Sequence, residues 1–393
     1  MASGVTTIRW GILATGMIAG DFAKDLLTNP ACRDVHDVKH EVFAAASSSS
    51  VSRAQSFLED IEAPSSAKAY GSYAELVQDP DVDVVYVATP HSHHFQNAML
   101  CLQAGKNVLC EKALTVNAAQ ARKLIETAKA KNLFFMEAVW TRYFPLSIKI
   151  REMVMGGVIG RVHRVIADLS IAFVKEDGSH ALGDSHRMVN PDLAGGSLLD
   201  LGIYALTWNF QILYHCQPKP REAPSVIAAI DKYSRTGADD TTSMILHFPK
   251  QNSMGIALTS QRLDTDTDGK NSAGAAIRIQ GTKGEIQVMG PAYRPTRYRV
   301  IMKDGDGKVE EVECPIPTDK DRGNRGHGMF WEADEVARCL RDGKKESETL
   351  SWEESLVIME TMDSVRKQGG LVYPELIETD VYDENGLLNR GRA

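Results

Sequence analysis

The chain has 393 residues, of which 43% are hydrophobic and 24% charged, and its formal net charge is -8. This length exceeds what one hydrophobic core usually supports, and the ordinary globular composition excludes collagen-like, disordered and membrane-resident chains. The acidic balance argues against nucleic-acid binding, which needs clustered lysine and arginine. Six scattered cysteines with no C-x-x-C pair, and no leader-like or membrane-spanning run, predict a cytoplasmic protein with reduced thiols.

Short apolar runs alternate with helix-like segments as far as Glu137. The apolar runs predict strands at Ile8–Leu13, Glu41–Ala46, Val82–Ala88, Asn107–Cys110 and Leu133–Glu137. The intervening segments predict helices at Ile18–Leu27, Val51–Glu59, Tyr73–Gln78, Phe95–Ala104 and Asn117–Lys131. Strands that alternate with helices form a parallel, doubly wound sheet, and continuously apolar strands suit a sheet covered on both faces. We therefore predict an N-terminal α/β domain of the Rossmann type over residues 1–145.

The pattern changes after a helix that ends at Gly156 and Gly157. Alternating and β-branched runs now predict strands at Arg161–Phe173, Ser225–Lys232, Thr241–Phe248, Gly255–Ser260, Ala275–Gln280, Glu285–Met289 and Arg297–Met302. Helices are predicted at Leu198–Leu213, Phe330–Arg341 and Trp352–Lys367. We predict a C-terminal α+β domain on a large, mostly antiparallel open sheet over residues 146–375. A polar tail follows over residues 376–393, and the pattern does not predict its burial.

The first predicted strand runs into the loop A-T-G-M-I-A, Ala14 to Ala19. A dinucleotide-binding loop has the pattern G-x-G-x-x-G/A there, so Ala14 stands at the first glycine position. Gly16 keeps the second position, where a side chain would stop backbone amides from approaching a diphosphate. The motif alone is also compatible with a purely structural turn. Its place on the first strand of an alternating α/β domain favours cofactor binding.

The second strand bears on the choice of cofactor. An enzyme that uses NAD normally places Asp or Glu on the ribose hydroxyls at the end of this strand, and none occurs from Val42 to Ala54. Serines and Arg53 stand there instead, and a guanidinium suits a 2'-phosphate. The alternative is that Ser47 caps the next helix and Arg53 is merely solvated. We favour NADP.

Later motifs lie at the ends of later strands, where a doubly wound sheet binds its ligands. These motifs are VATPHSHH, LCEKALTVN and FMEAVWTRYFP, and AGGSLLDLGIY and IQGTKGEIQV occur further along the chain. Together they resemble the glucose-fructose oxidoreductase/inositol dehydrogenase (Gfo/Idh/MocA) family over roughly residues 8 to 370. Within it, EAVWTRYFP and the tyrosine-ended DLGIY most resemble the branch of dimeric dihydrodiol dehydrogenases and fungal NADP-dependent D-xylose 1-dehydrogenases.

The resemblance implies hydride transfer between a sugar-like alcohol and nicotinamide, and a C-terminal open sheet that forms a homodimer. The family's catalytic E-K-P lysine matches Lys112, although Ala113 replaces the proline and leaves the restraint on this loop in doubt. The family's D-x-G-x-H histidine is Tyr204 in this chain, as in the dihydrodiol dehydrogenase branch. His91 and His94 are implied to lie near the nicotinamide half of the cofactor.

The residue types themselves fit alcohol oxidation, which needs a hydride acceptor and a group that takes the hydroxyl proton. A free phenol has a pKa of about 10, and a neighbouring ammonium lowers that pKa by favouring the phenolate form. Lys112 could therefore tune Tyr204 and also bind the reacting oxygen. Asp200 precedes Tyr204 by one helical turn, so both could face one pocket, where Asp200 would bind a sugar hydroxyl or orient Lys112. Ordinary surface placement of these three residues is the alternative.

Two other clusters have less specific interpretations. His91, His93 and His94 suggest zinc, but no convincing further ligand motif accompanies them, and we predict no metal. Trp140, Arg142 and Tyr143 follow the strand predicted at Leu133–Glu137, where an indole face could pack on a sugar or diol ring and Arg142 could donate hydrogen bonds. The alternative is an aromatic cluster that seals the domain junction.

These inferences define a set of site residues. We expect Lys112, Tyr204 and Asp200 to be catalytic, and Trp140, Arg142, Tyr143, Asp200 and Tyr204 to contact substrate. The expected cofactor-binding residues are Ala14, Thr15, Gly16, Met17, Ile18, Ser47, Ser48, Ser49, Arg53, Thr89, Pro90, His91, His94, Glu111 and Lys112. The expected activity is NADP-dependent oxidation of the anomeric hydroxyl of an aldose, with D-xylose as the favoured substrate. Oxidation of a trans-dihydrodiol, or a non-catalytic NADP-binding sensor, are the alternatives.

Overall fold

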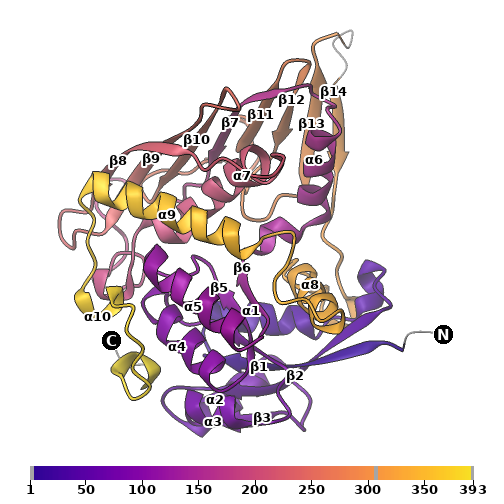
Figure 1. The fold of residues 1–393 in the computed structure, drawn as a ribbon, viewed down its shortest axis with the longest axis vertical. Helices are drawn as coiled ribbons and strands as arrows, with labels where there is room; N and C mark the ends of the chain where they lie inside the picture. The colour runs from indigo at the N-terminus through magenta and orange to yellow at the C-terminus, as the bar shows by residue number, and fades with distance from the viewer. Residues whose placement is uncertain (1–3, 305–308, 391–393) are drawn as a thin grey trace. The chain divides into compact units, whose positions relative to one another are not determined.

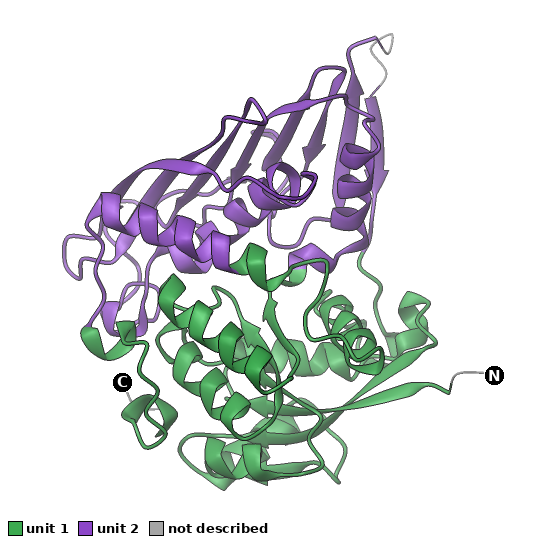
Figure 2. Ribbon diagram, viewed as in Figure 1, with its two compact units in different colours: residues 1–140, 316–355, 375–393 green, residues 141–315, 356–374 purple. Residues whose placement is uncertain are grey.

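A computed structural model describes residues 4–304 and 309–390. The chain divides into two compact units (Figure 2). Unit 1 comprises residues 1–140, 316–355 and 375–393, and unit 2 comprises residues 141–315 and 356–374. The expected division at 1–145, 146–375 and 376–393 differs from these units in three places: residues 316–355 and 375–393 belong to unit 1, and residues 141–145 belong to unit 2.

Unit 1 is built on a six-stranded parallel sheet with the order β3-β2-β1-β4-β5-β6 (Figure 1). The strands are β1 (Thr6–Leu13), β2 (Val38–Ala46), β3 (Lys68–Tyr70), β4 (Val84–Val87), β5 (Asn107–Glu111) and β6 (Phe135–Ala138). The helices are α1 (Met17–Leu26), α2 (Val51–Asp60), α3 (Tyr73–Gln78), α4 (His91–Gln103), α5 (Ala118–Ala130), α8 (Phe330–Arg341) and α10 (Glu375–Glu378). The predicted Rossmann architecture is confirmed, with the short edge strand β3 added.

The strand order of this sheet changes direction between β1 and β4, which are neighbours. Ligands of doubly wound sheets bind at such a point, beyond the carboxyl ends of the strands. The loops that start at Ala14 and at Ala88 flank this place. Helix α4 begins at His91 instead of the expected Phe95, because its polar first turn carries no apolar periodicity. His91, His93 and His94 therefore lie on a helix.

Unit 2 contains an eight-stranded sheet with the order β14-β13-β12-β11-β7-β10-β9-β8. The strands are β7 (Val162–Asp168), β8 (Ser225–Lys232), β9 (Asp239–Phe248), β10 (Ser253–Ser260), β11 (Ile277–Gly281), β12 (Gly284–Val288), β13 (Arg297–Met302) and β14 (Val309–Glu313). Neighbouring strands are antiparallel except β7 and β10, which are parallel. The predicted mostly antiparallel sheet is confirmed, and β14 is an edge strand that the sequence analysis missed.

Three longer helices contribute to unit 2: α6 (Pro145–Met155), α7 (Ile203–Leu213) and, from Leu356 onward, α9 (Trp352–Gly369). Helix α7 packs on β7 and β10, and every residue along it is buried. The expected helix over 198–213 is present, but its first five residues, Leu198–Gly202, form a π-helical turn. Such wide turns are rare and occur frequently at functional sites.

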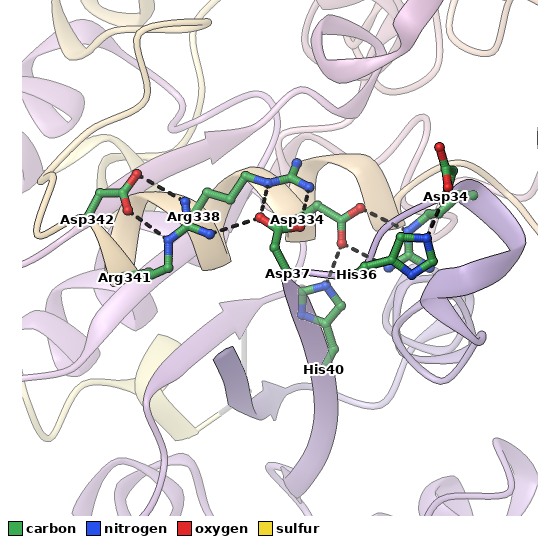
Figure 3. A network of polar contacts seen from close by, with 9 residues as sticks. Asp34, His36, Asp37, His40, Asp334, Arg338, Arg341 and Asp342 are labelled. Atoms are coloured by element: carbon green, nitrogen blue, oxygen red, sulfur yellow. Dashed lines mark hydrogen bonds and ion pairs between the residues drawn. The ribbon is translucent and has the colours of Figure 1, made fainter. Parts of the chain in front are cut away.

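A buried ion pair explains why the segment with α8 belongs to unit 1. Arg33 donates from Nε and Nη2 to the two carboxylate oxygens of Asp334, at 2.9 and 2.8 Å. His40 lies 2.9 Å from Asp334 through Nε2 (Figure 3), and its Nδ1 accepts from the indole N–H of Trp10 at 3.2 Å. Because an indole nitrogen only donates, His40 is neutral and donates through Nε2. Burial lowers the pKa of His40, which favours this neutral form.

Two further contacts hold the same segment. Asp25 is buried in α1, and its carboxylate accepts the backbone N–H groups of residues 327, 328 and 329 at 2.7 to 2.8 Å. Asp37 accepts from the guanidinium groups of Arg338 and Arg341 at 2.9 to 3.0 Å (Figure 3). Residues about three hundred positions apart thus join α8 to the strands and helices of the Rossmann sheet.

Among the described residues, no helix is long and apolar enough to cross a membrane.

Candidate active site

The loop after β1 has the backbone form of a dinucleotide-binding turn. Ala14 has φ +93°, in the region that favours glycine, and its N–H donates to the carbonyl of Ala46. Gly16 has φ -82°, and a Cβ built there meets no atom of residues 4–304 or 309–390 within 4 Å. Neither backbone conformation nor protein packing therefore requires glycine at 16. The close approach of a diphosphate does require it.

Helix α1 begins directly after this loop. No side chain caps its N-terminus at Gly16, and Met17 is 78% exposed. Uncapped N–H groups at the start of a helix are suited to a diphosphate. Thr15 and Ile18, two further expected cofactor residues, are half-buried on the same loop and first turn.

The serine run after β2, Ser47–Ser50, contains the residue that caps helix α2. Ser50, and not Ser47, caps helix α2 by accepting the N–H of Arg53 at 3.3 Å. The alternative role of Ser47 as the cap is therefore wrong, because the helix starts three residues later than that role requires. Ser47 is buried, and its hydroxyl lies 3.0 Å from that of Ser49. Arg53 lies exposed on the first turn of α2.

Ser48 faces Tyr73 of helix α3. Burial raises the pKa of the Tyr73 phenol, and a hydrogen bond with Ser48 and the positive charge of Arg53 oppose this rise. The serine run, Arg53 and the start of α3 therefore form one polar corner beside β2. A ribose 2'-phosphate needs hydroxyl donors and a guanidinium, and this corner supplies both.

The loop between β4 and α4 carries the next expected cofactor residues. Thr89 is buried, and its hydroxyl has no hydrogen-bond partner among the described residues. Pro90 occupies the N-cap position of α4 and makes no side-chain cap. A buried hydroxyl without a protein partner, at the point where the strand order reverses, fits a hydrogen bond to a bound dinucleotide.

His94 joins this loop to the loop that carries Lys112. Its Nδ1 lies 2.9 Å from the carbonyl oxygen of Ala113, and its Nε2 lies 2.9 Å from that of Thr89. Burial lowers the pKa of His94 to about 4, so the neutral ring donates to one carbonyl at a time. The ring of His91 lies edge-on to His94, with centroids 5.4 Å apart. These histidines shape the two loops.

The loop of Lys112 keeps its restraint although Ala113 replaces the expected proline. Glu137 on β6 accepts the N–H of Leu114 at 3.0 Å and the hydroxyl of Ser355 at 2.6 Å. Glu111 accepts the hydroxyl of Tyr86, and its other oxygen accepts the N–H of Lys112 at 3.2 Å. Buried carboxylates therefore hold both sides of Lys112, which is itself half-buried.

In unit 2, Asp200 lies on the π-helical turn and Tyr204 on the first turn of α7. Arg187 donates to the two carboxylate oxygens of Asp200 at 3.1 and 3.5 Å. The ring of Tyr204 lies 5.9 Å from that of Tyr293 and is tilted to it by 54°. Sequence reasoning missed both Arg187 and Tyr293, because each lies in a loop with no recognisable motif.

The backbone that leads into this turn is anchored by Asp239 at the start of β9. Its carboxylate accepts the hydroxyl of Ser197 at 2.8 Å and the N–H of Leu198 at 2.6 Å. Gly196 has φ +145°, and a Cβ there would lie 1.8 Å from the carboxylate of Asp239. Glycine at 196 is therefore required by the close approach of the Asp239 side chain.

Trp140, Arg142 and Tyr143, which follow β6, have different surroundings. Trp140 is buried in unit 1 and stacks on His327, with centroids 5.0 Å apart and planes 13° apart. Arg142 and Tyr143 belong to unit 2 and are buried, and Arg142 donates to Nδ1 of His215 at 3.2 Å. A substrate-binding role for these residues stays a prediction. Lys112 lies in unit 1 and Asp200 and Tyr204 in unit 2, so their convergence also stays a prediction.

The fold and the β1 loop define the class of two-domain, dinucleotide-binding oxidoreductases. Residues 8–139 match the family model described as "Oxidoreductase family, NAD-binding Rossmann fold", and residues 147–287 match the "GFO/IDH/MocA C-terminal domain". The chain belongs to the Gfo/Idh/MocA oxidoreductase family.

Two relatives cover nearly the whole chain. A D-xylose 1-dehydrogenase (NADP(+)) from Hypocrea jecorina is 63% identical over 394 residues, which is 100% of both chains. A trans-1,2-dihydrobenzene-1,2-diol dehydrogenase from Sus scrofa is 36% identical over 373 residues, 94% of this chain and 98% of that protein.

Solved structures share the fold at lower identity. A 3-ketoreductase from Actinomadura kijaniata, solved with NADP, has a TM-score of 0.70 at 23% identity and covers 92% of this chain and 98% of its own. An aldose-aldose oxidoreductase from Caulobacter crescentus has a TM-score of 0.72 at 20% identity, with 93% and 98% coverage. These structures confirm the expected architecture.

Proposed function

We propose that the protein oxidises the anomeric hydroxyl of an aldose, with D-xylose as substrate and its lactone as product. The observation that carries this proposal is the 63% identity to the D-xylose 1-dehydrogenase (NADP(+)) over the entire length of both chains. Retention of Lys112, Asp200 and Tyr204 supports a catalytic protein, because binding of a cofactor alone requires none of these side chains.

In the proposed mechanism, Tyr204 takes the proton of the anomeric hydroxyl as the C–H bond breaks. The ammonium of Lys112 favours the phenolate form of Tyr204 and binds the reacting oxygen. When bound, the nicotinamide supplies the hydride acceptor. Asp200, held by Arg187, accepts a hydrogen bond from a sugar hydroxyl and fixes the orientation of the ring.

We propose NADP as the cofactor. The loop at Gly16 fits a dinucleotide, as does the hydroxyl of Thr89, which has no partner in the described part of the chain. Ser47, Ser48, Ser49 and Arg53 follow β2, where its 2'-phosphate is expected. An acidic residue at the end of β2, which would repel that phosphate, is absent from residues 42–54. Arg53→Ala is expected to raise the KM for NADP selectively, and an equal rise for NAD would contradict this role.

The experiment that tests the activity is a steady-state assay with a panel of aldoses and a trans-dihydrodiol, using both coenzymes. We expect NADP reduction with D-xylose to be much faster than NAD reduction. Tyr204→Phe should lose most turnover and still bind NADPH, and normal turnover in this variant would reject the proposed base. Faster oxidation of the diol would favour the second activity, which the 36% identity to the Sus scrofa enzyme suggests. NADPH binding without any turnover would favour a sensor.

We also propose that the protein is a cytoplasmic homodimer. Dimerisation is expected from the family resemblance. One face of the eight-stranded sheet of unit 2 carries exposed apolar side chains at Ile227, Ile245 and Met254, which are 70%, 42% and 45% exposed. None of the six cysteines, all of which lie in the described part of the chain, forms a disulfide, which suits a reducing compartment. Sedimentation of the wild type and of Ile245→Lys tests the dimer: the wild type should sediment as a dimer and the variant as a monomer.

A further inference from the structure

The C-terminal segment is docked on the nucleotide-binding unit by amide side chains. Gln120 donates to the carbonyl oxygens of Ile377 and Thr379 at 2.7 and 2.9 Å, and Asn117 donates to that of Glu378 at 2.9 Å. These bonds begin an ordered path over helices α5 and α4. The start of the tail, whose burial the sequence pattern did not predict, is therefore fixed by hydrogen bonds to three successive backbone carbonyls.

The path continues over α4. Gln96 donates to the carbonyl of Val381 at 2.8 Å and accepts the N–H of Asp383 at 3.0 Å. Asn97, which is fully buried, donates to the carbonyl of Leu388 at 3.2 Å and to the side chain of Asn389 at 3.0 Å. Leu388 is 3% exposed. The tail thus reaches the neighbourhood of the β2 loop with its last described turn, Leu387–Arg390, in a defined position.

A cavity of about 390 Å³ lies at the end of this path. Ser48 lines it from the loop after β2, Tyr73 lines it from α3, and Glu384, Asn389 and Arg390 line it from the tail. Ser48 belongs to the loop after β2, where a Rossmann fold receives the adenosine ribose of its cofactor. The wall contributed by the tail therefore stands beside the expected cofactor site.

We propose that the tail completes the site for the adenosine 2'-phosphate end of NADP, with Arg390 as a second cation for that phosphate. This inference rests on the proposed use of NADP. Arg53 and Arg390 would bind the phosphate from two sides, because a guanidinium presents paired donors that match phosphate oxygens. Ser48 supplies a hydroxyl group, whereas the amide of Asn389 bonds to Asn97 and to the carbonyl of Asp383 and holds the tail in place. Glu384 on the same wall weakens the local positive potential.

Arg390 and Glu384 carry opposite charges on the tail's side of the cavity, so their variants should change phosphate binding in opposite directions. Loss of Arg390 should weaken binding of a 2'-phosphate, whereas loss of the Glu384 charge should strengthen it. A tail that only stabilises the fold would not produce effects of opposite sign. Both side chains lie on the same short segment, so a general disturbance of the docked tail would weaken binding in both variants.

The experiment is calorimetric titration of the full-length protein, at low ionic strength, with adenosine 2',5'-bisphosphate and with adenosine 5'-monophosphate. We expect Arg390→Ala to weaken binding of the bisphosphate by about tenfold or more and to leave the monophosphate unchanged. Arg390→Lys should recover part of the loss. Glu384→Gln should tighten bisphosphate binding by about two- to fivefold. Lys129→Ala, which removes an exposed positive charge from α5, is the matched control and should have no effect.

A further variant tests whether the docking of the tail on α4 positions Arg390. Asn97→Ala removes the bonds to Leu388 and Asn389 without touching Arg390, and it should weaken bisphosphate binding, with the melting temperature recorded to confirm folding. Unchanged discrimination between the two nucleotides in Arg390→Ala would overturn the inference, as would weaker binding in Glu384→Gln. A wild type that does not prefer the bisphosphate would instead refute the proposed use of NADP.

Discussion

The guanidinium of Arg187 lies 3.1 Å from Oδ1 and 3.5 Å from Oδ2 of Asp200. Arg187 belongs to the long loop between β7 and the π-helical turn, and its side chain is 48% exposed, whereas that of Asp200 is 13% exposed. The pair thus links this loop to a residue expected to bind sugar. A guanidinium carries five N–H groups, and the Arg187 guanidinium uses two of its nitrogens in this pair.

The first prediction concerns this pair. Arg187→Ala should raise the KM for the sugar by about tenfold, because Asp200 loses the partner that orients it, while the KM for NADP stays unchanged. Arg187→Lys should show a smaller rise. Arg235→Ala is the matched control, because Arg235 is an exposed arginine that pairs at 2.7 Å with Asp184 in the same loop. An equal rise in the control would attribute the effect to loop charge alone.

The second prediction concerns the anchor of the π-helical turn. Gly196→Ala places a methyl group 1.8 Å from the Asp239 carboxylate at φ +145°, so the chain must shift. We expect a loss of about 2 kcal/mol or more in unfolding free energy and most of the turnover. Gly183→Ala is the control, because a Cβ there meets nothing within 4 Å. Urea denaturation of both variants checks this, and a wild-type midpoint for Gly196→Ala would contradict the proposed anchoring.

The third prediction tests the strained residue in the cofactor loop. Ala14 has φ +93°, so Ala14→Gly should relieve backbone strain and raise the melting temperature, by an amount equivalent to about 1 kcal/mol. The same substitution at Ala19, buried within α1, should lower stability by about 1 kcal/mol, because glycine is unfavourable inside a helix. Thermal unfolding of the two variants gives the comparison. A loss of stability in Ala14→Gly would show that the loop does not hold this conformation in solution.

The fourth prediction is a dependence of stability on pH. Burial lowers the pKa values of His93 and His94 to about 4, while an unfolded histidine has a pKa near 6.5. Between these values the unfolded chain binds more protons, so stability is full above about pH 6.5 and falls as the pH drops toward 4. The loss should approach about 2 kcal/mol for each histidine at about pH 5.

Urea denaturation at neutral and at mildly acidic pH measures this dependence. His93→Gln should flatten it, because glutamine can keep a hydrogen bond with Ser92 and does not titrate. His36 is exposed and makes a suitable control, since His36→Gln should keep the wild-type slope. A wild-type slope in His93→Gln would mean that this ring does not remain neutral in the folded protein.

The sequence by itself determined the order of strands and helices, the two sheet types and the cofactor loop. Strands such as Ser225–Lys232 and Arg297–Met302 and the helix Phe330–Arg341 were predicted with the observed bounds. Apolar periodicity and glycine placement are local patterns, and they determine the secondary structure of the few residues around them. The short edge strands β3 and β14 escaped prediction, because an edge needs little apolar surface.

Tertiary structure alone decided which distant residues became partners. The bond of Arg33 to Asp334 placed α8 in unit 1, and the bond of Arg187 to Asp200 brought an unmarked loop to a predicted site residue. Asn97 fixed the tail over α4. Each contact joins side chains whose pairing depends on the folded path of the backbone between them. No local pattern of the chain records such a pairing, because the energy of the contact exists only after the intervening elements have packed.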